Sequence, residues 1–147
     1  MIISDWFIWL LFGHFFGDFL FQNDWMSMNK KSNVVACWVH CTIYTITVVI
    51  FLFFGGLDLS LFSMILIYIS HHIFDGSYLL DYWFKLIGTR SWDTHIPRHS
   101  DGSLDLTGNN NNLGRLVSIS FGAIVYVVAD NILHLFLMFL IVKYTVL

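Results

Sequence analysis

Residues 34–54 read VVACWVHCTIYTITVVIFLFF, a continuous run without Asp, Glu, Lys or Arg. A helix needs about 20 predominantly apolar residues to cross the hydrocarbon core of a bilayer, so this run alone predicts a transmembrane helix. The composition of the chain agrees, because 57% of its 147 residues are hydrophobic and 12% are charged. Soluble domains carry about 25% charged residues. We therefore expect an integral membrane protein.

Three more apolar segments accompany this run, at residues 6–22, 60–82 and 116–142. Together the four segments predict an all-α fold. We expect a polytopic membrane helical bundle with about four transmembrane helices, in a single transmembrane domain over residues 1–147. Residues 85–114 are polar and contain the only proline, so they predict one long loop outside the membrane.

Positive charge predicts how these spans are oriented. All the basic residues except Lys143 fall between the first two spans or in and beside the long loop. Because cytoplasmic connections are enriched in Lys and Arg, the loop is expected in the cytoplasm and both termini outside. The net charge of −3 offers no basic excess for binding nucleic acid. The basic residues on the cytoplasmic side are Lys30, Lys31, Lys85, Arg90, Arg98 and Arg115.

Three predicted spans each contain a histidine and an aspartate four residues apart, a spacing that places both on one helix face. The order is reversed in the last span, which runs in the opposite direction to the other two. Antiparallel helices would therefore align a layer of histidines above a layer of aspartates. A charge at the centre of a span costs about 2.5–3.5 kcal/mol, so a cation, protons or water must offset the aspartates. The pairs are His14 with Asp18, His71 with Asp75, and Asp130 with His134.

The second span adds His40, at a depth similar to that of the aspartates. Imidazole and carboxylate suit divalent zinc, manganese or iron. The set is larger than the three protein ligands of a typical catalytic zinc, and two divalent ions with three carboxylates and one hydroxide would be neutral. We therefore expect one or two ions, with Asp18, Asp75 and Asp130 as catalytic residues. The predicted metal ligands are His14, Asp18, His40, His71, Asp75, Asp130 and His134.

Several alternatives stay open at this point. The polar groups are also explained by a network that only holds the helices together. His72 is an alternative to His71 as the inward residue, although only His71 is four residues from Asp75. Cys37 and Cys41 flank His40 and are interpreted either as thiolate ligands or as small buried apolar residues.

Small and polar residues flank the predicted ligands. Gly13, Gly17 and Gly76 would let helices approach closely beside the pairs. Metal-bound histidines usually have hydrogen-bonded partners behind them. Polar side chains one helical turn from the ligands are expected to provide such support: Gln22, Tyr44 and Tyr126.

The stretch from His14 to Gln22 reads HFFGDFLFQ. It resembles the H-x-x-x-D-F-x-L-Q signature of an uncharacterised integral membrane family of bacteria and their phages. A lysine before the second span, His40, His71 with Asp75, and the last pair are similar too, although Asn131 departs from the glutamine common in that family. The resemblance leaves out residues 86–114. It implies a bacterial inner-membrane protein, and the family is distantly similar to membrane-bound proteins described as metal-dependent hydrolases.

These patterns support three functional hypotheses. The first is a metal-dependent hydrolase acting on a lipid-like or lipid-linked substrate near the cytoplasmic leaflet. In this hypothesis Arg98 and His99 of the long loop cover the site. The alternative for these two residues is that they belong to an ordinary solvated loop. The second is a proton or metal transporter, against which the nearly apolar outer halves of spans two and four count. The third is a non-enzymatic membrane interaction protein of phage or bacterial origin. Membrane lipid is the expected partner, and a homo-oligomer stays open.

Overall fold

The computed structural model describes residues 5–86 and 112–147, and in the second range the side chains from residue 120 onward. All regular structure within these ranges is helical, and no strand occurs there. The chain divides into two compact units. The first unit comprises the residues up to Tyr78 together with Leu133–Leu147, and the second comprises Leu79–Ile132.

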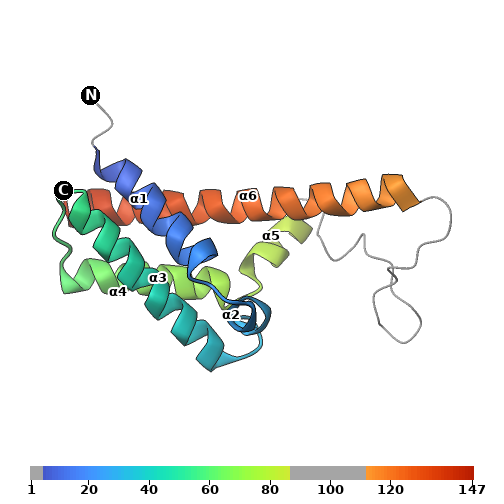
Figure 1. Ribbon diagram of the computed structural model, residues 1–147, viewed down its shortest axis with the longest axis horizontal. Coiled ribbons are helices and arrows are strands. Elements are labelled where there is room, and N and C mark those ends of the chain that lie inside the picture. Colours follow the sequence, from blue (N-terminus) through green and yellow to red (C-terminus); the bar gives the residue numbers. More distant parts are fainter. Residues whose placement is uncertain (1–4, 87–111) are drawn as a thin grey trace. The chain divides into compact units, whose positions relative to one another are not determined.

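The first unit is a bundle in which consecutive long helices run in opposite directions. Both α1 and α4 run antiparallel to α3, which lies against each of them (Figure 1). The bounds are Trp6–Phe15 for α1, Phe16–Leu20 for the π-helical turn η1, Asp24–Asn29 for α2, Val34–Phe54 for α3 and Leu61–Asp75 for α4. The C-terminal part of α6 (Asn112–Thr145) also belongs to this unit.

Polar caps and glycines fix where the helices of this unit begin and end. Asn33 Oδ1 accepts hydrogen bonds from the backbone N–H groups of Val35 and Ala36 at the start of α3. Ser60 Oγ accepts one from the Ser63 N–H at the start of α4. Side-chain caps satisfy N–H groups that the helix itself leaves unpaired. After α3 the chain turns at Gly56, whose φ of +79° favours glycine.

Two of the predicted spans are shorter in the structure than expected. The segment predicted at 60–82 is α4 only as far as Asp75, and Gly76 follows as the C-cap of that helix. The segment predicted at 6–22 changes from α to π geometry at Phe16 and ends at Leu20. A hydrogen bond from the Phe21 N–H to the Phe16 carbonyl, at 2.9 Å, closes this wider turn.

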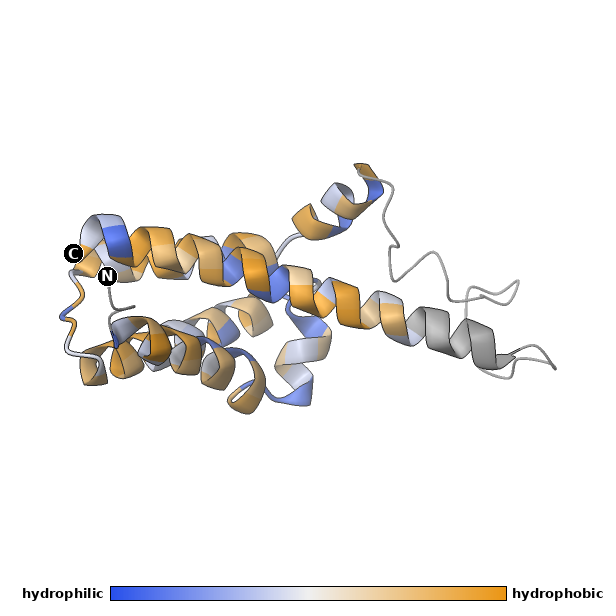
Figure 2. Ribbon diagram, turned by 90° about the horizontal axis from the view of Figure 1, so that it is seen from above, coloured by the Kyte–Doolittle hydropathy of each residue, from blue (hydrophilic) through white to orange (hydrophobic). Residues whose placement is uncertain are grey.

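Two helices are long and apolar enough to cross a membrane, by length and composition: Val34–Phe54 and Ser120–Thr145. Shorter apolar helices occupy Trp6–Leu20 and Leu61–Asp75. Most residues along these helices are hydrophobic (Figure 2).

Burial in the first unit is inverted relative to a soluble protein. Ile46, Phe53 and Leu61 expose 54%, 64% and 73% of their surface, whereas His40 and His71 expose 0% and 1%. An apolar core also exists, which meets the histidines at Tyr44, and Trp6 in this core stacks on Phe139 of α6. The core residues are Trp6, Leu10, Tyr44, Val48, Leu52, Ile67, Met138 and Val142.

The second unit contains α5 (Leu79–Leu86) and α6 as far as Ile132. Leu80 and Phe84 are the buried residues of α5. The ring of Phe84 packs against Tyr126 of α6, with ring centroids 5.5 Å apart.

Candidate metal centre

The π-helical turn η1 positions the first carboxylate of the centre. Asp18 lies in the middle of this turn and is buried. A π turn is wider than an α turn, so it changes the direction of the residues that follow it. Such turns are rare and occur frequently at functional sites. Asp18 therefore does not keep the regular α-helical register with His14 that its spacing predicts.

Three buried groups from α3 and α4 complete a cluster with Asp18: His40, His71 and Asp75. His40 Nε2 lies 2.8 Å from Asp75 Oδ2 and 3.3 Å from Asp18 Oδ1. His71 Nε2 lies 3.3 Å from Asp75 Oδ2 and 3.9 Å from Asp18 Oδ1. The two Nε2 atoms face each other at 3.0 Å. His40 therefore lies close to both aspartates of the cluster, and its depth in a membrane stays a prediction.

The distances among these four groups match those among the ligands of a single ion. Tetrahedral ligands with bonds of about 2.0–2.1 Å lie about 3.3 Å from one another. Here five ligand pairs are separated by 2.8–3.9 Å, and the four donor atoms all lie within 4.8 Å of one another. The donor set, two imidazoles and two carboxylates, suits zinc, manganese or iron.

Further histidines extend the cluster on one side of Asp75. His134 Nε2 lies 3.7 Å from the other carboxylate oxygen, Asp75 Oδ1. The His134 ring lies 4.7 Å from His71 and 5.9 Å from His14, measured between centroids. Asp75 therefore presents one oxygen to His40 and His71 and the other to His134. The histidines and aspartates interleave here, and their division into two layers across a membrane stays a prediction.

Tyr44 supports these histidines, as its position one turn after His40 predicted. Its ring stacks on His71 with a centroid distance of 3.5 Å and an interplanar angle of 2°. Its hydroxyl lies 2.8 Å from His14 Nδ1 and donates to Met138 Sδ at 2.9 Å. These contacts fix the His71 ring plane from behind.

Lys30 is a member of the cluster that sequence reasoning used only for topology and as part of a resemblance. Its Nζ donates to Asp75 Oδ2 at 2.6 Å and to Gln22 Oε1 at 3.2 Å. Its side chain is largely buried, at 18% exposure. One sequence signal points to Lys30. Buried carboxylates need a cation nearby, and Lys30 and Lys31 are the basic residues nearest to Asp18 in the sequence.

With both histidines neutral, the charges of the cluster cancel only if a further cation or a proton is added. Asp18 and Asp75 carry two negative charges against the single positive charge of Lys30. In addition, His40 Nδ1 and His71 Nδ1 are buried and have no hydrogen-bond partner within the described residues. Each unpaired buried polar group costs about 1–3 kcal/mol. A divalent ion bound by the Nε2 atoms would offset the charge of the carboxylates, and the two Nδ1 atoms would stay unpaired among the described residues with or without it.

Two glycines allow the helices to come this close. A β-carbon at Gly17 would lie 2.9 Å from Tyr44 Cδ2, and one at Gly13 would lie 3.0 Å from Val48 Cα. The close approach predicted from these small residues is present between α3 and the segment formed by α1 and η1.

A protein-family model matches residues 6–147 of the chain. The family is described as a protein of unknown function, DUF3307. The chain belongs to this family. Comparison with curated proteins and with solved structures found no match.

In this DUF3307 member, the remaining predicted site residues are placed as follows. Asp130 lies on α6 one turn before His134, within the second unit, and its role as a ligand stays a prediction. Tyr126, predicted to support it, packs on Phe84. Arg98 and His99, predicted to cover the site, lie outside the described residues.

Proposed function

We propose that this protein is an integral membrane metallohydrolase that cleaves a phosphoester of a lipid or lipid-linked molecule. The observation that carries the proposal is the convergence of four buried donors, Asp18, His40, His71 and Asp75, within 4.8 Å. Their residue types and spacing fit one divalent ion. The orientation of Asp75 Oδ1 toward His134, at 3.7 Å, supports a second ion beside the first, with Asp75 as the shared ligand.

Membrane insertion is supported by the inverted burial of the first unit. Bilayer lipid is the solvent in which exposed Ile and Phe side chains and buried histidines are both favourable. We propose four membrane-crossing segments, α1 with η1, α3, α4 and α6, in a bacterial inner membrane. The count of Lys and Arg favours a cytoplasmic location for the α2–α3 connection and an outside location for both termini.

The depth of the centre favours a substrate whose reacting group lies near the membrane surface. At 1.5 Å per residue, the fifteen residues of α4 span about 22 Å, less than the roughly 30 Å of a hydrocarbon core. Asp75 is the last residue of α4, and Asp18 lies in the short turn that ends the first apolar helix. Both carboxylates therefore lie toward the water boundary on the side of α2, where lipid headgroups are found.

The charge of the centre favours an anionic substrate. With one divalent ion, Asp18, Asp75 and Lys30 would sum to a single positive charge. A phosphodiester carries one negative charge and would neutralise the site, which is favourable in a low dielectric. Lys30 Nζ, 2.6 Å from Asp75 Oδ2, is placed to orient a phosphoryl oxygen beside the carboxylate.

The roles of the protein side chains follow from these positions. A bound divalent ion would supply Lewis-acid polarisation of a phosphoryl oxygen and activation of water. Asp18, His40, His71 and Asp75 would hold it. When only this one ion is bound, His134, next to Asp75 and His71, is placed to accept a proton from the attacking water, and Tyr44 keeps the His71 ring in its plane.

The test is a screen of lipid phosphoesters and lipid-linked intermediates with detergent-purified protein. Asp18→Asn conserves size but removes a charge that holds the ion, so turnover should fall by more than the roughly 10–100-fold that follows loss of a hydrogen-bonding partner behind a metal ligand. His134→Ala should also lower turnover, and chelation should abolish it reversibly. Asp24→Asn, at an exposed acidic residue, is the matched control and should retain wild-type activity.

Other outcomes would redirect the assignment. Equal activity in wild type, Asp18→Asn and His134→Ala would mean that a contaminant is responsible. Ion flux into liposomes that depends on Asp130, without hydrolysis, would establish a transporter. A folded protein with neither activity nor bound metal would leave the non-enzymatic interaction role.

A further inference from the structure

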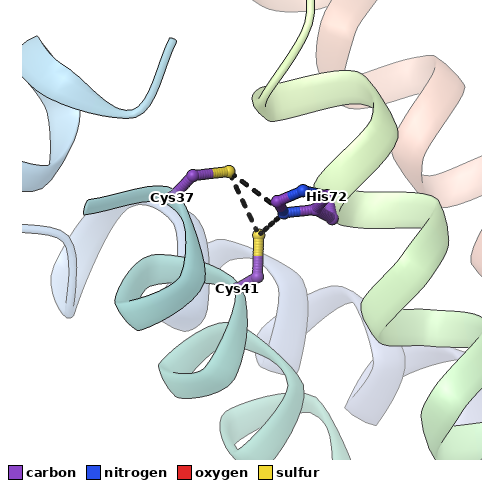
Figure 3. Close-up of side chains that lie close together, drawn as sticks. All are labelled: Cys37, Cys41 and His72. Carbon is purple, nitrogen blue, oxygen red and sulfur yellow. Dashed lines mark hydrogen bonds between the residues drawn. The ribbon is translucent and has the colours of Figure 1, made fainter. Parts of the chain in front are cut away.

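A second cluster of donor side chains lies between α3 and α4, apart from the carboxylates. Cys37 and Cys41 of α3 point toward His72 of α4 (Figure 3). His72 Nδ1 lies 3.2 Å from Cys37 Sγ and 3.7 Å from Cys41 Sγ, and the two sulfur atoms are 3.8 Å apart. Both cysteines are buried and neither forms a disulfide.

The three distances match those in a tetrahedral zinc site. With Zn–S bonds of about 2.3 Å and Zn–N bonds of about 2.05 Å, tetrahedral geometry places two sulfurs about 3.8 Å apart and a sulfur about 3.6 Å from a nitrogen. The observed sulfur–sulfur distance is 3.8 Å, and the two sulfur–nitrogen distances, 3.2 and 3.7 Å, lie on either side of the second value. An ion would therefore fit between the donors without movement of either helix.

Neighbouring residues hold these donors in place. A β-carbon at Gly76 would lie 2.9 Å from Cys37 Sγ, so the glycine that ends α4 also provides the space for the thiol. The ring of Tyr68 lies parallel to His72, with an interplanar angle of 6° and centroids 6.1 Å apart. Cys37 and Cys41 are one turn apart on α3, which places both thiols on the face toward His72.

This cluster is separate from the Asp/His centre because consecutive helix residues point about 100° apart. His71 faces His40 and Asp75, whereas the next residue, His72, faces the thiols. The two donor sets also differ in chemistry. Thiolates select softer ions than carboxylates do.

We propose that Cys37, Cys41 and His72 form a second metal site, selective for a thiophilic divalent cation of the zinc type. Two thiolates, one neutral imidazole and one divalent ion sum to zero charge, the favourable state for a site buried between apolar helices. Three protein ligands leave one coordination position for water or another donor. This site is independent of the proposed hydrolase activity, which uses neither cysteine.

Cobalt(II) is the probe that tests this site, because thiolate ligation gives a near-ultraviolet charge-transfer band that carboxylates and histidines do not give. Reduced, metal-free wild type in detergent should develop this band on addition of Co²⁺ and lose it when Zn²⁺ is added. Cys41→Ser and His72→Ala should weaken or abolish the band. The double variant Asp18→Asn with Asp75→Asn should keep it, which separates this site from the Asp/His centre.

A folded wild type that gives no band, or a band that survives the double change Cys37→Ser with Cys41→Ser, would overturn the proposal. The clustering would then be a thiol–imidazole hydrogen bond. If the serine variants do not fold, wild type alone decides. Saturation with Zn²⁺ at ten times its dissociation constant should slow alkylation of the two thiols about tenfold, and an unchanged rate would contradict the site.

Discussion

The same pair of helices builds two donor sets of opposite character. On one face, His40 of α3 meets His71 and Asp75 of α4, with Asp18 and Lys30 beside them. On the other face, Cys37 and Cys41 of α3 meet His72 of α4. Adjacent residues of one helix thus belong to a carboxylate-rich centre and to a thiol-rich one.

The two donor sets differ in their net charge when no metal is bound. The Asp/His centre keeps two carboxylates against one lysine, so it requires a further cation or protons to offset its charge. The Cys/His cluster is neutral when its thiols are protonated, and hydrogen bonding to His72 satisfies it. Metal removal should therefore affect the first centre strongly and the second only weakly.

The largest expected effect is an all-or-none difference in chemical labelling between cysteines introduced at two connections. It tests whether the α2–α3 connection, next to both donor sets, faces the cytoplasm. In a variant lacking the native cysteines, Ser32→Cys samples the α2–α3 connection and Asp58→Cys the α3–α4 connection; both positions are exposed. An impermeant maleimide applied to intact cells should label the residue at position 58 only. Labelling of both from outside would exclude the four-span topology.

Next in size is the loss of metal-dependent stability in the carboxylate-rich centre. A ligand at 100 times its dissociation constant stabilises the folded state by about 2.7 kcal/mol. Manganese binds weakly to thiolates, so it should stabilise wild type by this amount through the carboxylate-rich centre. In Asp75→Asn the stabilisation should be lost, because one charged metal ligand is missing. Cys41→Ser should keep the full gain; its loss there would show that the two donor sets are not separate.

A steric change beside the first centre should have a smaller effect. Gly17→Ala would place a β-carbon 2.9 Å from the Tyr44 ring, which cannot shift freely because it stacks on His71 at 3.5 Å. Overpacking of this kind costs about 1–3 kcal/mol in the free energy of unfolding. Gly122→Ala is the matched control, since no described side chain lies within 4 Å of its β-carbon. Equal stability of the two variants would contradict close packing at Gly17.

The smallest expected effect comes from the hydroxyl of Tyr44. Tyr44→Phe keeps the stack on His71 but removes the 2.8 Å contact to His14 Nδ1 and the hydrogen bond to Met138 Sδ, a weak acceptor that adds little. The cost in unfolding free energy should be about 0.5–1.5 kcal/mol, the net value of one hydrogen bond. Cobalt binding by the cysteines should not change. A larger loss of stability than in Gly17→Ala would mean that the hydroxyl has a role beyond this bond.

Sequence alone predicted the helical class and much of the first donor set, because i, i+4 spacing survives in any regular helix. It placed His71 and Asp75 on one face and named His40 as a further member of the set, and these side chains lie together in the structure. It missed the π turn at Phe16–Leu20, since no residue pattern distinguishes that turn from α-helix, and therefore it kept His14 and Asp18 in simple register. It also extended the third span past Asp75, where Gly76 ends α4.

The tertiary partners of two residues were equally hard to predict. Lys30 reaches Asp75 across 45 sequence positions, a contact that depends on how α2 folds back on the bundle. The choice between His71 and His72 depended on a rotation of α4 that sequence does not specify. In the structure His71 faces His40 and Asp75, whereas His72 faces Cys37 and Cys41 instead.

The most direct measurement is elemental analysis of protein purified in detergent without chelators, comparing two double variants with wild type. The Cys37→Ser with Cys41→Ser variant should retain at least one zinc, manganese or iron ion per chain, held by the Asp/His centre. The Asp18→Asn with Asp75→Asn variant should lose that ion. A folded cysteine variant that contains no divalent metal, in a preparation that binds none on addition, would contradict the metal centre.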